Sequence, residues 1–538
     1  MYSIEQITHE NCLHGFFLSS SIKYPDNIAL SIEQKVWTYK EIEYTARKWA
    51  SAILEGLKDS PKRIGIFAYR SEVSYISVLA TLFTGAAFVP LNPSHSKDRI
   101  QNIVEISELD AIFVDNNSIK KFKDLTNIFS KVPLVLIPES DDLIQLENTL
   151  VLNKLDFNRC KPIETFPQVE GESIAYLLFT SGSTGIPKGV PISHNNVSHY
   201  ITFNKHRYNF SPADRFSQTF DQTFDLSVFD LFMAWASGAS VFSMSPMQLL
   251  SPATFINENK ITVWFSVPSI ASLLHKRGLL KPNAFPSLKW SLFCGEALPM
   301  KLVKLWEEAS PNSIIENLYG PTELTISCMA YRWDPIKSPN ECVNGIVPIG
   351  KVYQGLEEIV INEESRIVNR NEEGELCICG PQVFPGYWKN GELTRDKFYI
   401  ATDPESKVEK VYYRTGDLVK YLSNGQLVYI NRIDNQVKVM GYRVELSEVE
   451  GVLRTDDEVV DAIAMGWPME EGRVKGLVAF ITGSLQDTFN LKKRLSSVLP
   501  SYMVPREIYS IQEIPLNVNG KVDRQALKNF LHNEGNKL

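Results

Sequence analysis

The sequence predicts an α/β fold with a large N-terminal domain of mixed sheets and helices and a small α+β C-terminal domain. Its 538 residues exceed what a single hydrophobic core usually organises. Strand-like and helix-like stretches alternate over most of the length, which is typical of α/β architecture. From about Leu418 onward, short alternating strands and turns replace this pattern. We therefore expect an N-terminal domain at residues 1–432 and a C-terminal domain at 433–538.

Apolar periodicity predicts individual elements along the chain. The runs 64–68 and 111–114 are continuously apolar and predict buried strands. Apolar residues recur at helical spacing from Glu41 to Leu57 and from Val73 to Leu82. In the C-terminal region, a charged helix is expected from Leu446 to Arg454. These segments support two domains that differ in their pattern of strands and helices.

Composition and charge narrow the function classes. The net charge of −8 argues against a general affinity for nucleic acid or an anionic membrane. The N-terminus shows no basic and apolar secretory pattern, and no apolar run reaches the roughly 18–20 residues of a membrane span. The seven cysteines are scattered, and the Cys377-x-Cys379 pair lies in a predicted strand without further ligands nearby. We expect a soluble cytoplasmic protein with reduced thiols.

Residues 175–190 form the most informative segment. An apolar strand runs into a loop of glycines, hydroxyls and one lysine, a composition that brings N–H and O–H donors close to an anion. A flexible surface loop is the alternative. The Walker pattern is excluded because Lys188 is followed by Gly189 instead of a hydroxyl residue. The candidate phosphate-binding residues are Thr180, Ser181, Gly182, Ser183, Thr184, Gly185 and Lys188.

This loop resembles the nucleotide loop of the adenylate-forming superfamily, which includes acyl-CoA synthetases, luciferases and peptide-synthetase adenylation domains. The resemblance covers nearly the whole chain, and further motifs follow in the family's order. They are Trp37–Tyr39, Val89–Pro93, Asn317–Glu323, Gly374–Leu376, Tyr413–Asp417, Arg432–Lys438 and Asn519–Asp523.

The resemblance implies that the chain uses ATP and Mg²⁺ to adenylate a carboxylic acid. Such chemistry concentrates negative charge, so catalysis depends on positioning and on cations. Lys521 matches the catalytic lysine that bridges carboxylate and phosphate, although a solvated surface lysine is the alternative. Glu323 would hold magnesium. The implied nucleotide contacts are Asn317, Tyr319, Gly320, Thr322, Asp417 and Arg432.

Asp434 matches the family's hinge, about which the small C-terminal domain rotates between adenylation and thioester formation. After that rotation, Lys438 and Gly441 would approach the incoming thiol, and Phe224 would line the thiol tunnel. Met440 departs from the family pattern, in which arginine is common at that position.

Asp225 points to an amino acid as the substrate. It lies in a segment, 223–230, that resembles the recognition motif of peptide-synthetase adenylation domains, where a carboxylate binds the substrate's ammonium group. A carboxylate beside phosphates is unfavourable unless a cation lies between them, and fatty or aryl acids bring none. The alternative is that Asp225 caps the following helix.

The implied side-chain pocket is apolar and bulky, which favours a compact aliphatic substrate. It is most similar to that of free-standing L-prolyl-AMP ligases, and D-alanine–carrier-protein ligases are the second choice. An acyl-CoA synthetase and a nucleotide-binding module without chemistry are further alternatives. The pocket residues are Asp225, Leu226, Phe229, Phe265, Leu292, Cys294, Leu318, Ile326 and Ser327, together with Lys521.

The partner implied by the resemblance is a carrier protein with a phosphopantetheine arm. The chain ends soon after the Lys521 motif and contains no carrier-type Gly-Gly-x-Ser segment. We therefore expect a free-standing ligase that loads a separate carrier protein.

Overall fold

The structure of the chain is a computed structural model that describes residues 12–141, 146, 149–182, 186–368, 372–402, 408–434, 436–470, 472–484, 487–516 and 522–535. The chain divides into two compact units. The first unit comprises Met1–Ser94, Ile100–Thr180 and Lys188–Asp434, and the second comprises His95–Arg99, Ser181–Pro187 and Asn435–Leu538. Each unit is described by itself.

The first large sheet of the first unit follows the order β16-β15-β14-β13-β12-β10-β11-β1-β2. Its central strands β10 to β14 run parallel to one another. The strands are β1 (Ile28–Ile32), β2 (Lys35–Thr38), β10 (Arg215–Gln218), β11 (Ser240–Ser243), β12 (Val263–Ser266), β13 (Trp290–Phe293), β14 (Ile314–Tyr319), β15 (Met329–Arg332) and β16 (Lys351–Val352).

The second large sheet follows the order β7-β6-β5-β3-β4-β8-β9 and is parallel except for β9. Its strands 63–67 and 111–114 confirm the strands expected from the apolar runs there. The strands are β3 (Arg63–Phe67), β4 (Ala87–Leu91), β5 (Ala111–Val114), β6 (Leu134–Ile137), β7 (Val151–Asn153), β8 (Ile174–Thr180) and β9 (Lys188–Ser193).

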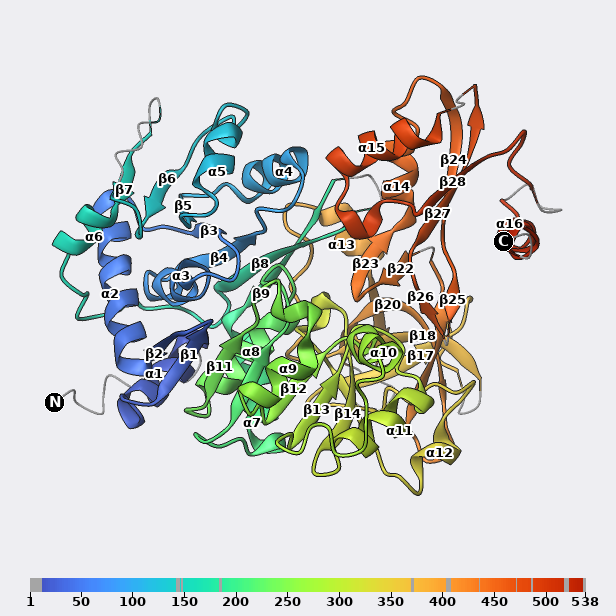
Figure 1. The fold of residues 1–538 in the computed structure, drawn as a ribbon, viewed down its shortest axis with the longest axis horizontal. Coiled ribbons are helices and arrows are strands. Elements are labelled where there is room, and N and C mark those ends of the chain that lie inside the picture. Colours follow the sequence, from blue (N-terminus) through green and yellow to red (C-terminus); the bar gives the residue numbers. More distant parts are fainter. Residues whose placement is uncertain are drawn as a thin grey trace. The chain divides into compact units, whose positions relative to one another are not determined.

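Helices fill and cover these sheets. Helices α1, α2, α3, α7 and α8 share one hydrophobic core with strands of both large sheets. Helices α9, α10 and α11 pack on the other face of the first sheet, and α4 and α5 on the other face of the second. Figure 1 shows α3 beside β3 and β4, and α2 beside α3. The helices are α1 (Leu13–Lys23), α2 (Tyr39–Gly56), α3 (Glu72–Phe83), α4 (Lys97–Ser107), α5 (Ile119–Thr126), α6 (Lys154–Arg159), α7 (His194–Tyr208), α8 (Leu226–Trp235), α9 (Pro252–Glu258), α10 (Pro268–Lys276), α11 (Met300–Ala309), α12 (Ser338–Glu341) and α13 (Gly391–Asp396), with short 3-10 turns η2 (Gln248–Leu250) and η3 (Thr322–Leu324).

The two N-terminal helices expected from apolar spacing are confirmed as α2 and α3. Both begin with a capping box. The side chain of the residue before the helix, Thr38 or Ser71, accepts a hydrogen bond from the backbone N–H of the third helical residue, and the side chain of that residue accepts one from the backbone N–H of Thr38 or Ser71. Their apolar stripes face the shared core, since Ile42, Ala46 and Ile53 of α2 are buried.

A third, antiparallel sheet completes the first unit. Its strands pair in the order β17-β18-β20-β19, and β21 also pairs with β20. Cys377 and Cys379 lie buried in β18, and the seven cysteines, all within the described residues, form no disulfide. The strands are β17 (Glu357–Ile361), β18 (Glu373–Cys379), β19 (Phe398–Thr402), β20 (Glu409–Tyr421) and β21 (Leu427–Arg432).

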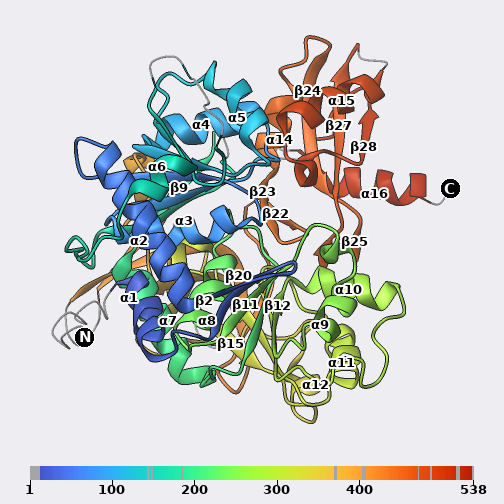
Figure 2. The ribbon, with the colours of Figure 1, turned by 60° about the vertical axis from the view of Figure 1, so that its left-hand side comes forward.

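The second unit is an α+β arrangement. Alternate residues of β24 and β27 face two separate cores: Ala462 and Ala464 face α14 and α15, while Ile463 and Met465 face α16. Figure 2 shows α16 apart from α15. Helix α14 confirms the helix expected from Leu446 to Arg454. The elements are β22 (Gln436–Val439), β23 (Tyr442–Glu445), α14 (Leu446–Leu453), β24 (Val459–Gly466), β25 (Met469–Glu470), β26 (Arg473–Val474), β27 (Leu477–Gly483), α15 (Thr488–Val498), η4 (Ser501–Met503), β28 (Glu507–Ser510) and α16 (Arg524–Gly535).

Candidate active site

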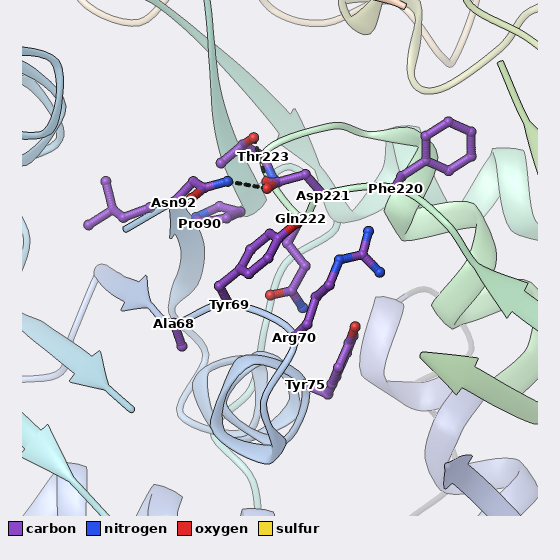
Figure 3. Close-up of a pocket in the computed structure, with 11 residues that line it drawn as sticks. Ala68, Tyr69, Arg70, Tyr75, Pro90, Asn92, Phe220, Asp221, Gln222 and Thr223 are labelled. Carbon is purple, nitrogen blue, oxygen red and sulfur yellow. Dashed lines mark hydrogen bonds between the residues drawn. The ribbon is translucent and has the colours of Figure 1, made fainter. Parts of the chain in front are cut away.

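The loop that leads from β10 to Asp225 is held by buried polar contacts. The Arg70 guanidinium donates to the carbonyl oxygens of Gln218 (3.0 Å), Thr219 (2.6 Å) and Met244 (2.7 Å). Asn92 donates to the carboxylate of Asp221. These groups surround a cavity of about 10 Å³, which is room for about one water molecule (Figure 3). The backbone before Asp225 is therefore fixed by partners from distant parts of the chain.

Asp225 is a buried carboxylate at the start of α8. Asp225 occupies the N-cap position of α8 without a side-chain capping hydrogen bond, although the backbone N–H of Leu226 at the start of the helix stabilises its carboxylate. Its Oδ2 accepts a hydrogen bond from the backbone N–H of Ile326 at 3.2 Å. Burial raises the pKa of Asp225 to about 7, although hydrogen bonds from Ile326 and Thr322 act in the opposite direction. Among the described residues, no lysine, arginine or histidine forms an ion pair with this carboxylate, and a substrate ammonium group would supply the positive charge.

The loop that donates to Asp225 has a strained backbone. Thr325 and Ile326 have φ angles of 58° and 71°, and positive φ is unfavourable for β-branched residues. Gln382 holds the loop, since its Nε2 donates to the carbonyl oxygens of Leu324 (3.2 Å) and Ser327 (2.9 Å). The Thr325 hydroxyl donates to the Gln382 carbonyl oxygen at 2.6 Å. Such strain persists only where surrounding contacts enforce it, and it is concentrated at functional sites.

The residues predicted to line the side-chain pocket lie together in the shared core of the first unit. Phe229 on α8 contacts Phe265 on β12 with ring centroids 4.8 Å apart. Adjacent strands β12, β13 and β14 contribute the remaining sheet positions. All the described pocket residues are buried, namely Asp225, Leu226, Phe229, Phe265, Leu292, Cys294, Leu318, Ile326 and Ser327.

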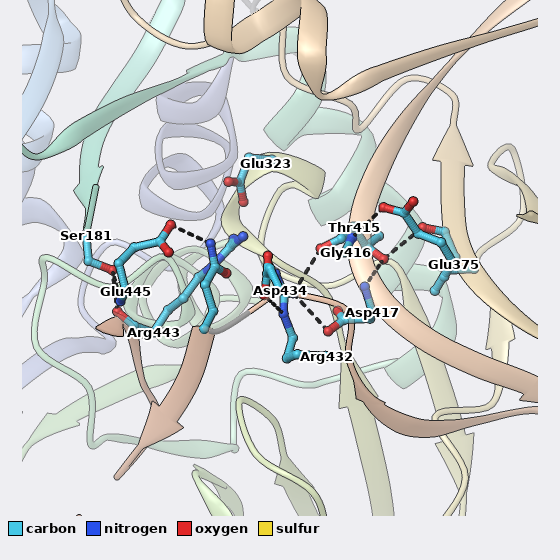
Figure 4. Close-up of polar contacts among 12 residues, drawn as sticks. Ser181, Glu323, Glu375, Thr415, Gly416, Asp417, Arg432, Asp434, Arg443 and Glu445 are labelled. Atoms are coloured by element: carbon cyan, nitrogen blue, oxygen red, sulfur yellow. Dashed lines mark hydrogen bonds and ion pairs between the residues drawn. The ribbon is translucent and has the colours of Figure 1, made fainter. Parts of the chain in front are cut away.

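A second polar cluster surrounds Asp417, which lies within strand β20. Tyr319 donates its hydroxyl proton to Asp417 Oδ2 at 2.5 Å, and Arg432 Nη1 lies 2.9 Å from Oδ1. Arg432 also forms an ion pair with Asp434 (Figure 4). Both carboxylate oxygens of Asp417 thus already accept one bond, and each retains a second lone pair for a ligand hydroxyl.

Gly416 makes this cluster possible. Its φ is +72°, and a Cβ there would lie 2.7 Å from Arg432 Nη2 and 3.0 Å from Asp434 Oδ2. Its N–H donates to Glu375 Oε1 at 3.0 Å, and Arg414 in turn binds Glu375 at 2.6 Å. A side chain at residue 416 would displace the guanidinium that links the two aspartates.

Glu323, the predicted magnesium ligand, is 1% exposed on the 3-10 turn η3. Its Oε1 accepts a hydrogen bond from the Tyr387 hydroxyl at 2.7 Å, and Lys188 Nζ lies 5.9 Å from the centre of the Tyr387 ring. Lys188 pairs with Thr180 across β8 and β9, so the two ends of the phosphate loop lie side by side. Tyr387, which no motif indicated, therefore joins the carboxylate and the lysine.

The second nucleotide motif lies at the end of β14. Asn317 Nδ2 donates to the carbonyl oxygen of Pro348 at 2.9 Å, which fixes the strand end. A Cβ at Gly320 would lie 2.6 Å from Ser327 Cα and 2.9 Å from the Cys328 nitrogen. Glycine is therefore required where the nucleotide motif passes the strained loop.

The remaining predicted residues lie elsewhere. Lys438 lies on β22 of the second unit, and Met440 and Gly441 form the two-residue turn to β23, both with positive φ. Phe224 is partly buried against the core of the first unit. Ser181 and Gly182 follow β8 and group with the second unit. Ser183, Thr184, Gly185 and Lys521 lie outside the described residues, so their predicted roles stay predictions.

Within the part of the chain that the structure describes, no three His, Cys, Asp or Glu side chains cluster to hold a metal ion. Glu323 would therefore hold magnesium together with phosphate oxygens, which is the usual donor set for that ion. Among the described helices, none is long and apolar enough to cross a membrane.

The parallel sheets, the buried carboxylate before α8 and the Tyr319–Asp417–Arg432 cluster define an enzyme of the adenylate-forming class. Comparison with protein families supports this assignment over most of the chain. Residues 18–388 match the AMP-binding enzyme family, and residues 448–521 match the AMP-binding enzyme C-terminal domain. The chain belongs to the AMP-binding enzyme family, and the resemblance and the fold inferred from sequence are confirmed.

Curated relatives include amino-acid-activating proteins. The chain is 30% identical over 518 residues to tyrocidine synthase 1 of Brevibacillus parabrevis, covering 96% of this chain and 44% of the synthase. It spans less than half the length of this and several similar synthases. It is also 30% identical over 516 residues to the D-alanine–D-alanyl carrier protein ligase of Bacillus licheniformis, covering 94% of this chain and 96% of the ligase.

Among solved structures, the adenylation domain AlmE of Vibrio cholerae, in complex with glycyl-adenosine-5'-phosphate, is similar throughout. The TM-score is 0.86 at 28% sequence identity, covering 99% of both chains. The relatives that match over almost their whole length thus include a carrier protein ligase and an adenylation domain in complex with glycyl-adenosine-5'-phosphate.

Proposed function

We propose that the chain adenylates a small amino acid with ATP, releasing pyrophosphate, and then transfers the aminoacyl group to the phosphopantetheine thiol of a separate carrier protein. The observation that carries this proposal is Asp225. Its carboxylate is buried and hydrogen-bonded, it forms no ion pair with a cation in the part of the chain that the structure describes, and burial raises its pKa to about 7. An α-ammonium group would complete the site, whereas a fatty or aryl acid would leave the carboxylate without a partner.

In the first half-reaction, the substrate carboxylate attacks the α-phosphorus of ATP and pyrophosphate leaves. Lys188 and the loop from Thr180 would hold phosphate oxygens, and Asp417 would accept hydrogen bonds from the ribose hydroxyls. Magnesium at Glu323 would neutralise phosphate charge when bound. Lys521 would stabilise the charge that develops between the two reactants.

In the second half-reaction, the carrier thiol attacks the aminoacyl carbonyl and AMP leaves. The C-terminal domain, proposed at residues 433–538, would turn about Asp434 and bring Lys438 and Gly441 toward the thiol path near Phe224. The ion pair between Arg432 and Asp434 supports a defined resting state at this position. Domain rotation of this kind occurs at a few residues that absorb the backbone change.

L-proline is the first candidate substrate because the described pocket residues are mostly apolar and bulky. D-alanine is the second, supported by the 30% identity to a D-alanine–D-alanyl carrier protein ligase over almost the whole of both chains. An acyl-CoA synthetase is a further alternative, and the buried Asp225 carboxylate argues against it.

Amino-acid-dependent exchange of labelled pyrophosphate into ATP tests the proposal across protein amino acids, D-alanine, and several fatty and aryl acids. We expect one or a few small amino acids to dominate, and Lys521→Ala to abolish their exchange. Exchange with fatty or aryl acids alone would overturn the proposal. Loading of a phosphopantetheinylated carrier protein, with free coenzyme A as the competing acceptor, then tests the second half-reaction.

A further inference from the structure

A chain of buried hydroxyl groups lies beside the proposed side-chain pocket. The Tyr200 hydroxyl on α7 lies 3.1 Å from Ser327 Oγ, and Ser327 Oγ lies 2.8 Å from the Tyr353 hydroxyl. Tyr200 and Ser327 are fully buried, and Tyr353 is 2% exposed. We call these residues the hydroxyl triad. Burying three hydroxyls is costly unless their protons find acceptors.

The hydroxyl triad adjoins the residues that surround Asp225. The Tyr200 ring packs edge-on against Phe229, with centroids 6.4 Å apart, and burial together with the charge of Asp225 raises the pKa of the Tyr200 hydroxyl. Ser327 directly follows Ile326, whose N–H binds Asp225. The triad and the carboxylate therefore border the same small region, reached from α7, α8 and the strained loop.

One of the three hydroxyl protons of the triad has no acceptor within the triad. Three hydroxyls carry three protons, and the two hydrogen bonds within the triad use two of them. Among the described residues, the structure shows no further acceptor in hydrogen-bonding geometry with any of the three oxygens. The third proton needs a further acceptor, such as an oxygen atom of a bound ligand or a water molecule, because a buried hydroxyl without one carries a penalty of about 1–3 kcal/mol.

We infer that the hydroxyl triad is a specificity-determining element that donates a hydrogen bond to an oxygen atom of the substrate's side chain. This inference rests on the proposed amino-acid adenylation and narrows its substrate class. Asp225 would hold the α-ammonium group, and the triad would select an acceptor-bearing side chain over a hydrocarbon of the same shape. Small hydroxyl amino acids then rank above L-proline and D-alanine.

The test compares pairs of amino acids that match in size, L-threonine with L-valine and L-serine with L-alanine, by pyrophosphate exchange. We expect the oxygen-bearing member to be favoured at least about 10-fold in kcat/KM, because a buried donor left unpaired penalises the hydrocarbon. In Tyr200→Phe and Tyr353→Phe, this preference should fall by about 10-fold or more, chiefly through the KM of the oxygen-bearing substrate.

Tyr208→Phe is the matched control. Tyr208 is another buried tyrosine on α7, but its hydroxyl donates to Glu316 at 3.0 Å and, among the described residues, makes no hydrogen bond to the triad. Its variant should leave the preference within each pair unchanged. If a triad variant does not fold, thermal stabilisation of the unaltered protein by L-threonine against L-valine decides the question.

The outcomes separate the inference from the proposed function. Equal rates within each pair, or a preference that survives both tyrosine substitutions, would overturn the inference and leave amino-acid adenylation standing; a water molecule would then satisfy the third proton. Exchange with fatty or aryl acids alone would overturn both. Loss of the preference in the two triad variants but not in Tyr208→Phe would support the inference.

Discussion

Arg432 and Asp434 form a bidentate ion pair, in which Nε lies 2.8 Å from Oδ1 and Nη2 lies 2.5 Å from Oδ2. The third nitrogen of the same guanidinium binds Asp417. One side chain therefore joins the carboxylate proposed for the ribose to the residue proposed as the hinge. Bidentate geometry is the strongest and most directional form of the arginine–carboxylate contact.

Replacing Asp434 with Asn should weaken the pair without removing Arg432 from Asp417. We expect adenylation to stay within about 3-fold of its original rate, because the Asp417 contact survives, while thioester formation changes by about 10-fold. Single-turnover measurements of adenylate formation and carrier loading distinguish the two steps. Asp461→Asn, which weakens a more exposed, single-contact pair with Arg454, is the control. Equal effects on both steps would contradict the proposed hinge.

Asp225 should make amino-acid binding depend on pH. Its pKa is raised to about 7, so the empty site is largely neutral at pH 6 and charged at pH 8. We expect the KM for the amino acid to fall as pH rises from 6 to 8, because only the charged carboxylate attracts the ammonium group. In Asp225→Asn, the KM should rise at least about 10-fold and lose this pH dependence.

The same substitution should stabilise the protein above neutral pH. The native pKa of Asp225 lies above its ordinary value of 3.8, so the wild-type protein loses stability as pH rises from about 4 to about 7. Asp225→Asn removes that penalty, and its free energy of unfolding at pH 8 should exceed that of the wild type by about 1–3 kcal/mol. The difference should shrink at pH 5. Denaturant unfolding at both pH values measures it.

Asp230→Asn provides a control on the same helix. Asp230 is fully buried, and burial raises its pKa as well. The substitution should therefore also stabilise the protein at high pH. It should nevertheless leave the KM for the amino acid and its pH dependence intact. A parallel loss of binding in both variants would show that the Asp225 effect is structural.

Asp417→Asn should weaken the binding of ATP and leave the binding of the amino acid unchanged. The substitution removes the charge that Arg432 and the Tyr319 hydroxyl now bind, and it weakens hydrogen bonds to ribose hydroxyls. We expect the KM for ATP to rise about 10- to 100-fold, which corresponds to hydrogen bonds with a charged group. The KM for the amino acid should change little. Initial rates with each substrate varied in turn check both, and a rise confined to the amino acid would refute the assignment.

Alanine substitutions at two glycines should change the stability of the protein in opposite directions. At Gly320 a Cβ would lie 2.6 Å from Ser327 Cα, so Gly320→Ala should displace the strained loop, lower Tm and impair activity. Gly451 lies exposed in α14 with nothing within 4 Å of the added carbon. Gly451→Ala should stabilise the protein by about 0.5–1 kcal/mol, because alanine favours the helix. Thermal unfolding of both variants gives the comparison.

Much of the fold could be predicted because its signals are local. The apolar runs of β3 and β5 and the helical spacing of α2 and α3 each lie within one short segment. Several site residues could be proposed for the same reason, since motifs such as the one around Asp417 are contiguous; their roles stay predictions.

The hydroxyl triad could not be predicted in this way. Tyr200 and Ser327 are 127 residues apart, and Tyr353 lies a further 26 residues along the chain. From sequence, Ser327 belonged to an apolar pocket, because a pattern of residues does not show which hydroxyls meet. Tyr387 and Gln382 were missed for a related reason: their contacts with Glu323 and the strained loop depend on how β18 and the following segment pack.

The buried Asp225 carboxylate also makes the stability of the protein depend on the concentration of its proposed substrate. A ligand that binds only the folded chain stabilises that state. The stabilisation grows with the ratio of free ligand concentration to Kd and reaches about 2.7 kcal/mol when this ratio is about 100. The substrate's ammonium group would in addition cancel the charge penalty at Asp225. Depletion of the proposed amino acid would therefore leave the enzyme less stable and more open to proteolysis.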